Sequence, residues 1–478
     1  MSASLLWFRQ DLRLTDNPAL QAALKSEQPI ICLYIFDENT TPSLGSAAKW
    51  WLHHSLTALN NALKQRGNRL ILRRGDPEKI LQEIICQNNI KNIFWNRMYE
   101  PAAIERDRKI KTYWIAQSLM VESFNAHLIF EPWTISNQQG KYYQVFTPFW
   151  RKGCSAGNNA FYKLTTAPTK IPALNSPLSS DNLNDWQLLP QKLNWATPFS
   201  TLWTPGELGA QNKLTHFITH DLKNYRHGRD FPALQNVSHL SPHLHWGEIA
   251  VHRVWDTLQH TQQDKNINLQ NIEHFQNELG WREFSYYLLY HFPQLPEKNF
   301  KNNLDHFTWK KSTHLLHAWQ KGHTGYPIVD AGMRELWHTG FMHNRVRMIV
   351  ASFLVKDLLI DWRIGSAWFL DTLVDADLAS NSMNWQWVAG CGPDAAPYFR
   401  IFNPVQQGIK FDPNGDYVRR WVPEIKNLPN DYIHCPWEAP DEVLAQAKIK
   451  LGKNYAYPLV EHKQARLIAL ALYKKQRN

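Results

Sequence analysis

Acids, an amide and two tryptophans gather in one stretch of this chain, residues 371–404. Within thirteen residues this stretch places Asp375, Asp377, Asn381, Trp385 and Trp387. The mixture fits neither the apolar spacing of an amphipathic helix nor the alternation of a strand, so we expect irregular chain here. Carboxylates and amides bind polar edges, and indoles stack on flat rings. The stretch therefore predicts a pocket for a large, flat ligand with polar edges, in preference to a tryptophan-rich core loop.

Length and charge narrow the class of protein. A chain of 478 residues with 44% hydrophobic and 20% charged residues indicates a globular protein of two or three domains. Lys and Arg exceed Asp and Glu by 52 − 42 = 10. This excess favours a polyanionic partner, with nucleic acid first and an anionic membrane surface second, although a merely basic enzyme would explain it equally well. Because no long Lys/Arg run exists, we expect the charge on a folded face.

The cysteines exclude two kinds of site. There are five, far apart in the chain and without a C-x-x-C pair, namely Cys32, Cys86, Cys154, Cys391 and Cys435. Neither a disulfide framework nor a metal site is expected from them, and a reducing compartment is indicated. The N-terminus lacks the apolar core of a signal peptide, and no apolar run approaches eighteen residues. We therefore expect a cytoplasmic protein with no membrane partner.

Short apolar runs alternate with helical patterns over residues 1–130. We expect strands at 5–8, 30–36, 70–72 and 92–95, and helices at 18–25, 46–64 and 77–87. This alternation predicts an α/β domain with a doubly wound parallel sheet, whose ligand-binding loops follow the carboxyl ends of the strands. No G-x-G-x-x-G is present, so an ordinary dinucleotide-binding site is not expected.

The composition changes at about residue 156 to Asn, Ser, Pro, Leu and Thr with little periodicity. We place an interdomain linker at 131–205 and expect it to wrap a folded surface. After it the strand signal disappears, and residues 206–478 predict an all-helical domain. The helices expected there span 207–225, 247–261, 272–291, 312–320, 327–339, 342–355, 365–374 and 461–475.

Two further groups of residues could bind a ligand. Ser241-Pro242 predicts a helix start with Ser as N-cap and Pro at N1, where hydroxyl and free N–H groups could cradle a phosphate, although an ordinary capped helix is the commoner meaning. On a helix Asn344 and Met348 share a face, with Arg347 close to it. Such an Arg-rich segment could pair with a carboxylate or a phosphate, or form ordinary surface ion pairs.

Four motifs together resemble the DNA photolyase/cryptochrome family. In chain order they are WFRQDLR at 7–13, TGYPIVD at 324–330, Asn381 with WQW at 385–387, and YFRIFNP at 398–404. The resemblance runs from the first strand to the final helix. Within the family the chain most resembles microbial cyclobutane pyrimidine dimer photolyases of class I and the related class III. Ser382-Met383-Asn384 is closer to class III, and the choice between the two classes stays open.

The resemblance implies that the C-terminal helical domain holds FAD in a U-shaped conformation. Asn381 would face flavin N5, and Arg347 would pair with Asp375 beside the isoalloxazine ring. One hydroxyl of the family's phosphate motif is absent, because Val237 stands at its first position. The implied cofactor-binding residues are Tyr225, Ser238, Leu240, Ser241, Arg282, Asn344, Arg347, Asp375, Asp377 and Asn381.

The activity that the resemblance implies is light-driven repair of cyclobutane pyrimidine dimers, a carbon–carbon lyase reaction. Excited reduced FAD would donate an electron to a flipped-out dimer, and photolyases are among the enzymes known to extrude their target base. Glu278, Asn381 and Met348 would act in catalysis. The dimer and its DNA would contact Glu278, Trp281, Asn344, Arg345, Met348 and Trp387.

The resemblance also implies routes by which light and electrons reach the flavin. Trp309, Trp362 and Trp385 would carry electrons from the surface to oxidised FAD. An antenna chromophore would bind in the N-terminal domain. The stretch Tyr99-Glu100-Pro101-Ala102-Ala103 lacks the Asn-Glu pair that binds folate in some class I enzymes. The pigment could therefore be 5,10-methenyltetrahydrofolate, bound in the class III manner, or 8-hydroxy-5-deazaflavin.

Two other activities within the family remain open. A cryptochrome would act as a blue-light photoreceptor without repair, and a (6-4) photolyase would repair a different lesion. The animal-type (6-4) enzymes would place histidines near 344–348, where this chain has Asn344, Arg345 and Met348. We expect a monomer whose partner is DNA that contains cyclobutane pyrimidine dimers.

Overall fold

A computed structural model describes residues 2–39, 42–154, 162–175, 178–234, 236–263, 267–394 and 400–475. The chain forms two compact units. The first consists of Met1–Lys223, Ser238–Pro293 and Val374–Ala379, and the second of Asn224–Val237, Gln294–Leu373 and Ser380–Asn478.

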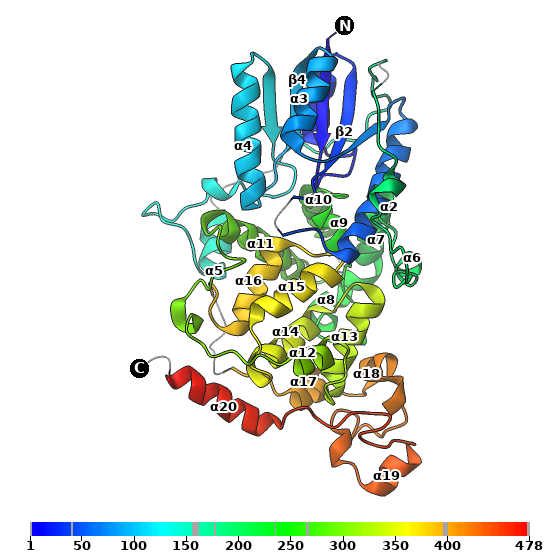
Figure 1. Ribbon diagram of the computed structural model, residues 1–478, viewed down its shortest axis with the longest axis vertical. Coiled ribbons are helices and arrows are strands. Elements are labelled where there is room, and N and C mark those ends of the chain that lie inside the picture. Colours follow the sequence, from blue (N-terminus) through cyan, green and yellow to red (C-terminus); the bar gives the residue numbers. More distant parts are fainter. Residues whose placement is uncertain are drawn as a thin grey trace. The chain divides into compact units, whose positions relative to one another are not determined.

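The first unit contains a five-stranded parallel sheet (Figure 1). Its strands are β1 (Ala3–Phe8), β2 (Ile30–Phe36), β3 (Leu70–Arg74), β4 (Ile90–Asn96) and β5 (Met120–Phe124), in the order β3-β2-β1-β4-β5. The order reverses direction next to β1, which is the mark of a doubly wound sheet. The predicted fold class is confirmed, and the sheet gains β5, which had not been expected.

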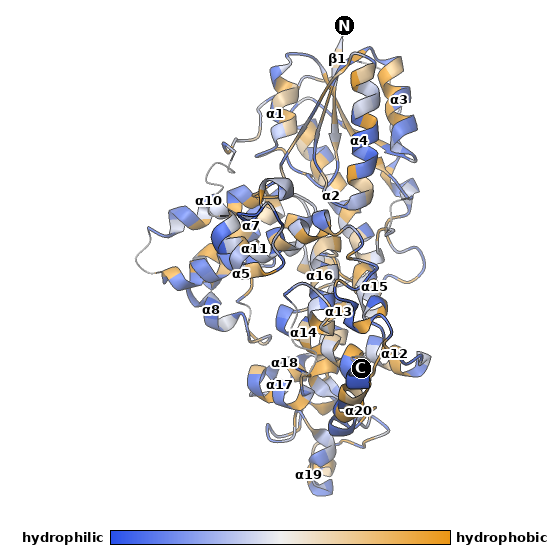
Figure 2. Cartoon of the chain, turned by 90° about the vertical axis from the view of Figure 1, so that its left-hand side faces the viewer, coloured by the Kyte–Doolittle hydropathy of each residue, from blue (hydrophilic) through white to orange (hydrophobic). Residues whose placement is uncertain are grey.

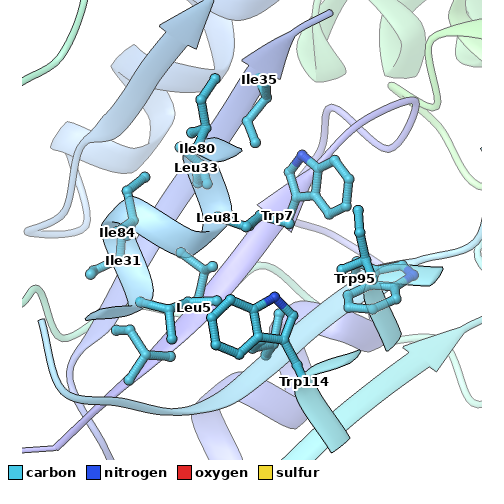
Figure 3. Close-up of a cluster of buried hydrophobic side chains, with 14 of the residues drawn as sticks. Leu5, Trp7, Ile31, Leu33, Ile35, Ile80, Leu81, Ile84, Trp95 and Trp114 are labelled. Carbon is cyan, nitrogen blue, oxygen red and sulfur yellow. The ribbon is translucent and has the colours of Figure 1, made fainter. Parts of the chain in front are cut away.

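Helices cover both faces of this sheet. They are α1 (Pro18–Lys25), α2 (Ser46–Lys64), α3 (Pro77–Gln87) and α4 (Pro101–Ala116). Ile80, Leu81 and Ile84 of α3 lie over alternate strand residues such as Leu5 and Leu33, as Figure 3 shows. In Figure 2, α3 carries both hydrophobic and hydrophilic residues, as expected for a helix that buries one side.

The segment after β5 runs along the edge of the sheet rather than away from it. Ile171 N donates to Arg66 O at 2.9 Å, and Asp181 N donates to Leu72 O at 2.8 Å. Trp186 stacks on Phe36 with ring centroids 5.4 Å apart. These contacts cover the outer strand β3, which would otherwise expose unpaired backbone groups.

The rest of the first unit contributes further helices; those at 241–245 and 269–291 carry predicted site residues. They include α5 (Phe146–Pro148), α6 (Phe199–Leu202), α7 (Glu207–His216), α9 (Ser241–His245), α10 (Val251–Thr261) and α11 (Leu269–His291). The prediction of one uninterrupted α-helix at 207–225 is wrong. After α7 the backbone forms a π-helical turn at Phe217–Asp221 and a 3₁₀ turn at Leu222–Asn224, and α8 (Tyr225–Gly228) follows.

The described residues of the second unit form helices and loops without a strand, apart from an isolated bridge between Leu451 and Tyr455. Besides α8, its helices are α12 (Thr313–Gln320), α13 (Pro327–Thr339), α14 (Asn344–Ser352), α15 (Trp362–Thr372), α16 (Leu378–Ala389), α17 (Pro404–Phe411), α18 (Asp416–Trp421), α19 (Asp441–Gln446) and α20 (His462–Lys475). The helix α16 begins in the first unit and continues in the second.

The prediction of irregular chain at the start of residues 371–404 is wrong, because Leu378–Ala389 is the helix α16. Among its residues only Asn384 is exposed. A helix that is buried on nearly every side needs no polar face, so the amphipathic spacing by which helices are recognised is missing. Part of the predicted turn at 390–397, and Tyr398 and Phe399, lie outside the described residues.

Within the described ranges, no helix is long and apolar enough to cross a bilayer, and no cluster of three or more His, Cys, Asp or Glu could hold a metal ion. All five cysteines are free thiols.

A tight backbone contact joins the loop after β1 to the turn between α9 and α10. Leu12 N donates to Trp246 O at 3.1 Å, and the buried Arg13 guanidinium donates to Gly247 O at 2.8 Å. Gly247 has φ +62°, and a Cβ there would lie 2.1 Å from Gln10 O. No side chain fits this position, because the obstructing atoms belong to the backbone.

We therefore expect Gly247→Ala to destabilise the protein by about 3 kcal/mol, from left-handed backbone strain and overpacking together. The matched control is Gly67→Ala, because Gly67 has φ +79° and a Cβ there would meet no atom within 4 Å. That change should cost only about 1 kcal/mol. Thermal unfolding of both variants measures the difference, and equal shifts in Tm would contradict the steric argument.

A buried carboxylate fixes the chain after β5 to α11. Glu283 Oε2 accepts the backbone N–H groups of Ile129, at 2.9 Å, and Phe130, at 3.1 Å. Burial raises the pKa of Glu283 to about 7, although Arg282 and these two N–H groups oppose the rise. A carboxyl that is more basic when folded than when unfolded binds more protons in the folded state between the two pKa values.

The free energy of unfolding should therefore fall as the pH rises from about 4.5 to about 7, by at most about 3 kcal/mol from this group, and then level off. Urea unfolding at several pH values, for the wild type and Glu283→Gln, isolates the contribution. If the difference between the two proteins is constant over this range, the raised pKa is wrong.

Candidate functional site

In the first unit, Ser241 and Asp375 form a direct pair. The Ser241 hydroxyl donates to Asp375 Oδ2 at 2.6 Å. The expectation that Ser241 caps its helix is wrong, because Leu240 is the N-cap of α9 and Ser241 is its first residue. The hydroxyl turns to the carboxylate of Asp375 instead, and Ser238 Oγ accepts the Leu240 N–H at 3.3 Å.

Asp377 lies in a second buried group, also in the first unit. Its carboxylate accepts the Tyr286 hydroxyl hydrogen bond, and His245 Nδ1 lies 3.5 Å from it. Burial alone would raise the pKa of Asp377, but His245, Tyr286 and the Arg282 charge outweigh burial and hold that pKa below its usual range. Asp377 is therefore a buried carboxylate that stays ionised.

Arg282 reaches this group through His127. Its guanidinium lies 2.7 Å from His127 Nε2 and donates to His127 O at 2.8 Å. Burial and the positive charge of Arg282 lower the pKa of His127 well below its ordinary value. His127 is therefore neutral, and Arg282 adds its positive charge to that of His245 near Asp377.

Three predicted residues follow one another on α11. Glu278 is half-buried, and so are Trp281 and Arg282. The Trp281 ring lies parallel to Phe146 with centroids 3.8 Å apart. This helix therefore presents a carboxylate and a fixed indole within one turn, while Arg282 joins the Asp377 group.

In the second unit, Asn381 and Trp385 lie one turn apart on α16 and both pack on α15. The Asn381 amide nitrogen donates to Ser366 Oγ at 2.8 Å and to Ser366 O at 3.1 Å. A Cβ on Gly365 would lie 2.2 Å from the Trp385 ring, so the indole rests directly on the α15 backbone. Because a carbonyl oxygen can only accept, the Asn381 nitrogen must face Ser366, and its oxygen remains available as an acceptor.

The three tryptophans of the predicted electron route differ in exposure. Trp385 is 2% exposed, Trp362 is fully buried, and Trp309 is partly exposed. Trp362 begins α15, one turn before the Gly365 backbone on which Trp385 rests. Its indole N–H donates to Asn299 Oδ1 at 2.9 Å.

Gln386 stands between Trp385 and Trp387 and anchors α16. It is fully buried. Its amide nitrogen donates to Leu295 O at 2.7 Å and to Lys298 O at 2.8 Å, and its oxygen accepts the Phe300 N–H at 2.8 Å. Both polar atoms of this amide thus bond to the backbone of one loop, residues 295–300. These three hydrogen bonds fix the rotation of α16 about its axis. Trp387 is half-buried.

The remaining predicted residues of the second unit lie on α14 and α8. Asn344 is exposed at the start of α14, and Met348 follows one turn later. Arg345 donates to Asp230 at 2.7 Å, and its guanidinium lies 3.8 Å from the Met348 sulfur. Arg347 donates to Met342 O at 2.7 Å, while its pairing with Asp375 stays a prediction. Tyr225 is buried at the start of α8.

Several partners of these residues are not predicted from the sequence. His127, His245 and Tyr286 surround Asp377, and Ser366 orients Asn381. Tyr286 lies one turn after Arg282 on α11, which is a usable signal. His127 and Ser366 carried no signal, because their partners are distant in sequence.

The donor set indicates the chemistry of the ligand. Serine hydroxyls and carboxylates match a polyhydroxylated chain, and an amide with a fixed acceptor oxygen matches an N–H on a ring edge. These groups fit FAD, which carries ribityl and ribose hydroxyls and a ring with polar edges.

Comparison with known proteins agrees with this chemistry. Residues 4–173 match the family model described as DNA photolyase, and residues 275–475 match the FAD binding domain of DNA photolyase. The chain is 50% identical to a deoxyribodipyrimidine photo-lyase of Agrobacterium fabrum, over 98% of this chain and 97% of the relative. It is 38% identical to Cryptochrome-1 of Arabidopsis thaliana, over 96% of this chain and 68% of the relative.

A solved structure of a bacterial class III photolyase from Agrobacterium tumefaciens superposes with a TM-score of 0.97 and 49% identity. The superposition covers 100% of this chain and 98% of that one. The chain belongs to the DNA photolyase/cryptochrome family.

Proposed function

We propose that the protein repairs cyclobutane pyrimidine dimers in DNA with light, as a photolyase of the class III type. The observation that carries this proposal is the arrangement of α16. Its Asn381 amide, with a fixed acceptor oxygen, and its buried Trp385 indole lie one turn apart, and both pack on the neighbouring helix α15. The similarity to the Agrobacterium photolyases supports the same activity and the class.

FAD, when bound and reduced, supplies the excited electron that splits the dimer. We propose that Tyr225, Ser238, Leu240 and Ser241 contact its phosphates and ribose. Asp375 and Asp377 would border the ring and the ribityl chain, and Asn344 and Arg347 would lie along the cofactor.

Asn381 would accept a hydrogen bond from flavin N5–H. Ser366 holds the amide nitrogen, so the side chain offers an oxygen and cannot turn its N–H₂ group without losing two hydrogen bonds. An amide is far less acidic than a carboxylic acid, so it does not readily transfer a proton to the ring. This arrangement would preserve the protonation of the reduced ring through each catalytic cycle.

The lesion would be received by Glu278, Trp281, Asn344, Arg345, Met348 and Trp387. Trp281 and Trp387 provide flat surfaces for the extruded bases, and stacking on an aromatic side chain contributes about 1–3 kcal/mol per base. Glu278 would hydrogen-bond the pyrimidine edge, and Met348 would fill the apolar side of the cavity. The positive charge of Arg345 is already shared with Asp230.

An antenna chromophore in the α/β part of the chain completes the proposal. A reduced folate absorbs in the near ultraviolet, and a deazaflavin absorbs in the blue. The absorption spectrum of the purified protein, after subtraction of the flavin bands, separates the two pigments.

Illuminated repair of defined oligonucleotides tests the activity. With FAD reduced beforehand, the wild type should restore thymines from a cyclobutane dimer and leave a (6-4) photoproduct unchanged. If the protein repairs only the (6-4) lesion, its substrate is the (6-4) photoproduct and not the cyclobutane dimer. Repair of neither lesion by FAD-loaded protein would favour a photoreceptor, the second candidate, which rests on the similarity to Cryptochrome-1.

We expect Trp385→Phe to slow photoreduction of oxidised FAD by at least about tenfold, because phenylalanine is much harder to oxidise than tryptophan. Repair by chemically reduced protein should be unchanged. Trp114→Phe, at a buried indole of α4 in the sheet unit, is the matched control and should reduce normally. An unchanged rate of photoreduction in Trp385→Phe would remove Trp385 from the electron route.

A further inference from the structure

An aromatic clamp, formed by Phe146 and Trp150, holds one of the proposed stacking surfaces. Phe146 lies face to face with Trp281, with centroids 3.8 Å apart and ring planes inclined by 10°. The Trp150 ring is inclined by 14° to the Phe146 ring, with centroids 6.4 Å apart. The Phe146 and Trp281 rings thus form a face-to-face pair, in which Phe146 is buried and Trp281 is partly exposed.

The clamp also contacts the backbone of α11. A Cβ on Gly280 would lie 2.7 Å from Trp150 Cδ2 and Cε2, so this ring rests directly on the helix beside Trp281. Only glycine leaves room for an indole there. The clamp therefore grips both the ring of Trp281 and the main chain that precedes it.

The segment that carries the clamp is itself fixed to α11 further along. Tyr143 N donates to Tyr287 Oη at 2.9 Å, and Phe149 packs on Phe284 and Tyr287 with centroids 5.1 and 4.8 Å apart. Phe146 is 8% exposed. The clamp is thus a built part of the fold and not a loose side-chain contact.

A stacking surface binds a base more tightly when its plane is already fixed. A mobile indole would lose rotamer freedom on binding, and that entropy would subtract from the stacking energy. Phe146 covers one face of Trp281, which limits stacking of a base to the opposite face.

We propose that Phe146 is a positioning residue for lesion recognition, which orients Trp281 so that an extruded pyrimidine dimer stacks on its other face. The inference rests on the proposed repair function. It assigns a part in dimer recognition to the connecting segment, outside the helices that carry the predicted substrate residues.

The test is binding in the dark, with FAD-loaded full-length protein and fluorescence anisotropy. The probes are an oligonucleotide with one cis-syn thymine dimer and the same oligonucleotide without damage. Phe146→Leu should weaken binding to the dimer about three- to tenfold, which corresponds to loss of one aromatic pair. Affinity for undamaged DNA, FAD content and repair yield at saturating DNA should stay unchanged.

Two matched variants separate positioning from general packing. Phe146→Tyr keeps the ring and should bind the dimer like the wild type. Phe149→Leu removes a buried ring three residues away, which packs on Phe284 and Tyr287, and should retain the preference for the dimer. Gly280→Ala displaces Trp150 and should reduce dimer affinity in the same direction as Phe146→Leu.

An unchanged dimer preference in Phe146→Leu and Gly280→Ala would overturn the inference. Tighter dimer binding by Phe146→Leu would also overturn it, because Phe146 would then block the stacking face. Equal losses for both oligonucleotides would indicate a structural role only. A wild type with no dimer preference at all would instead contradict the proposed function.

Discussion

The packing of α16 on α15 is the constraint on which the second unit's site depends. Gly365 has no side chain, so Trp385 reaches the α15 backbone, and Ser366 next to it holds the Asn381 amide. Any larger residue at 365 would push the two helices apart. Asn381 and Trp385 would then move together, because one helix carries them. The proposed flavin contact and the proposed electron route thus share one close approach of two backbones.

Burial of charge is the corresponding constraint in the first unit. Asp377 stays ionised because Tyr286, His245 and Arg282 offset the cost of its burial. The Asp375 carboxylate accepts a hydrogen bond from the Ser241 hydroxyl. Groups that are already oriented and shielded from water need little rearrangement when charge shifts in a bound ligand. An electron-transfer protein benefits from such fixed surroundings, since reorganisation of polar groups would add to the barrier.

Sequence reasoning succeeded where the chain carries strong local signals. The bounds of α1 and α3 were predictable because Asn17 and Asp76 cap them and a proline follows each cap. It failed where tertiary contacts decide. Because α16 is almost completely buried, its sequence lacks the apolar spacing typical of a helix. The Ser241 hydroxyl donates to Asp375, 134 residues away, and does not cap its helix. Among the site residues, the acids and indoles were visible as types, but the groups that orient them were not.

Gln386 has a consequence for how this family can diversify. Successive residues of a helix are rotated by about 100°, so Trp385 and Trp387 point about 200° apart, on opposite sides of α16. Gln386 holds the helix between them through three backbone groups of the 295–300 loop. We therefore expect a change of the Trp387 side chain alone to leave the packing of Trp385 on α15 unchanged. With the roles proposed for Trp385 and Trp387, selection can tune photoreduction and substrate choice separately, as two traits carried by a single helix.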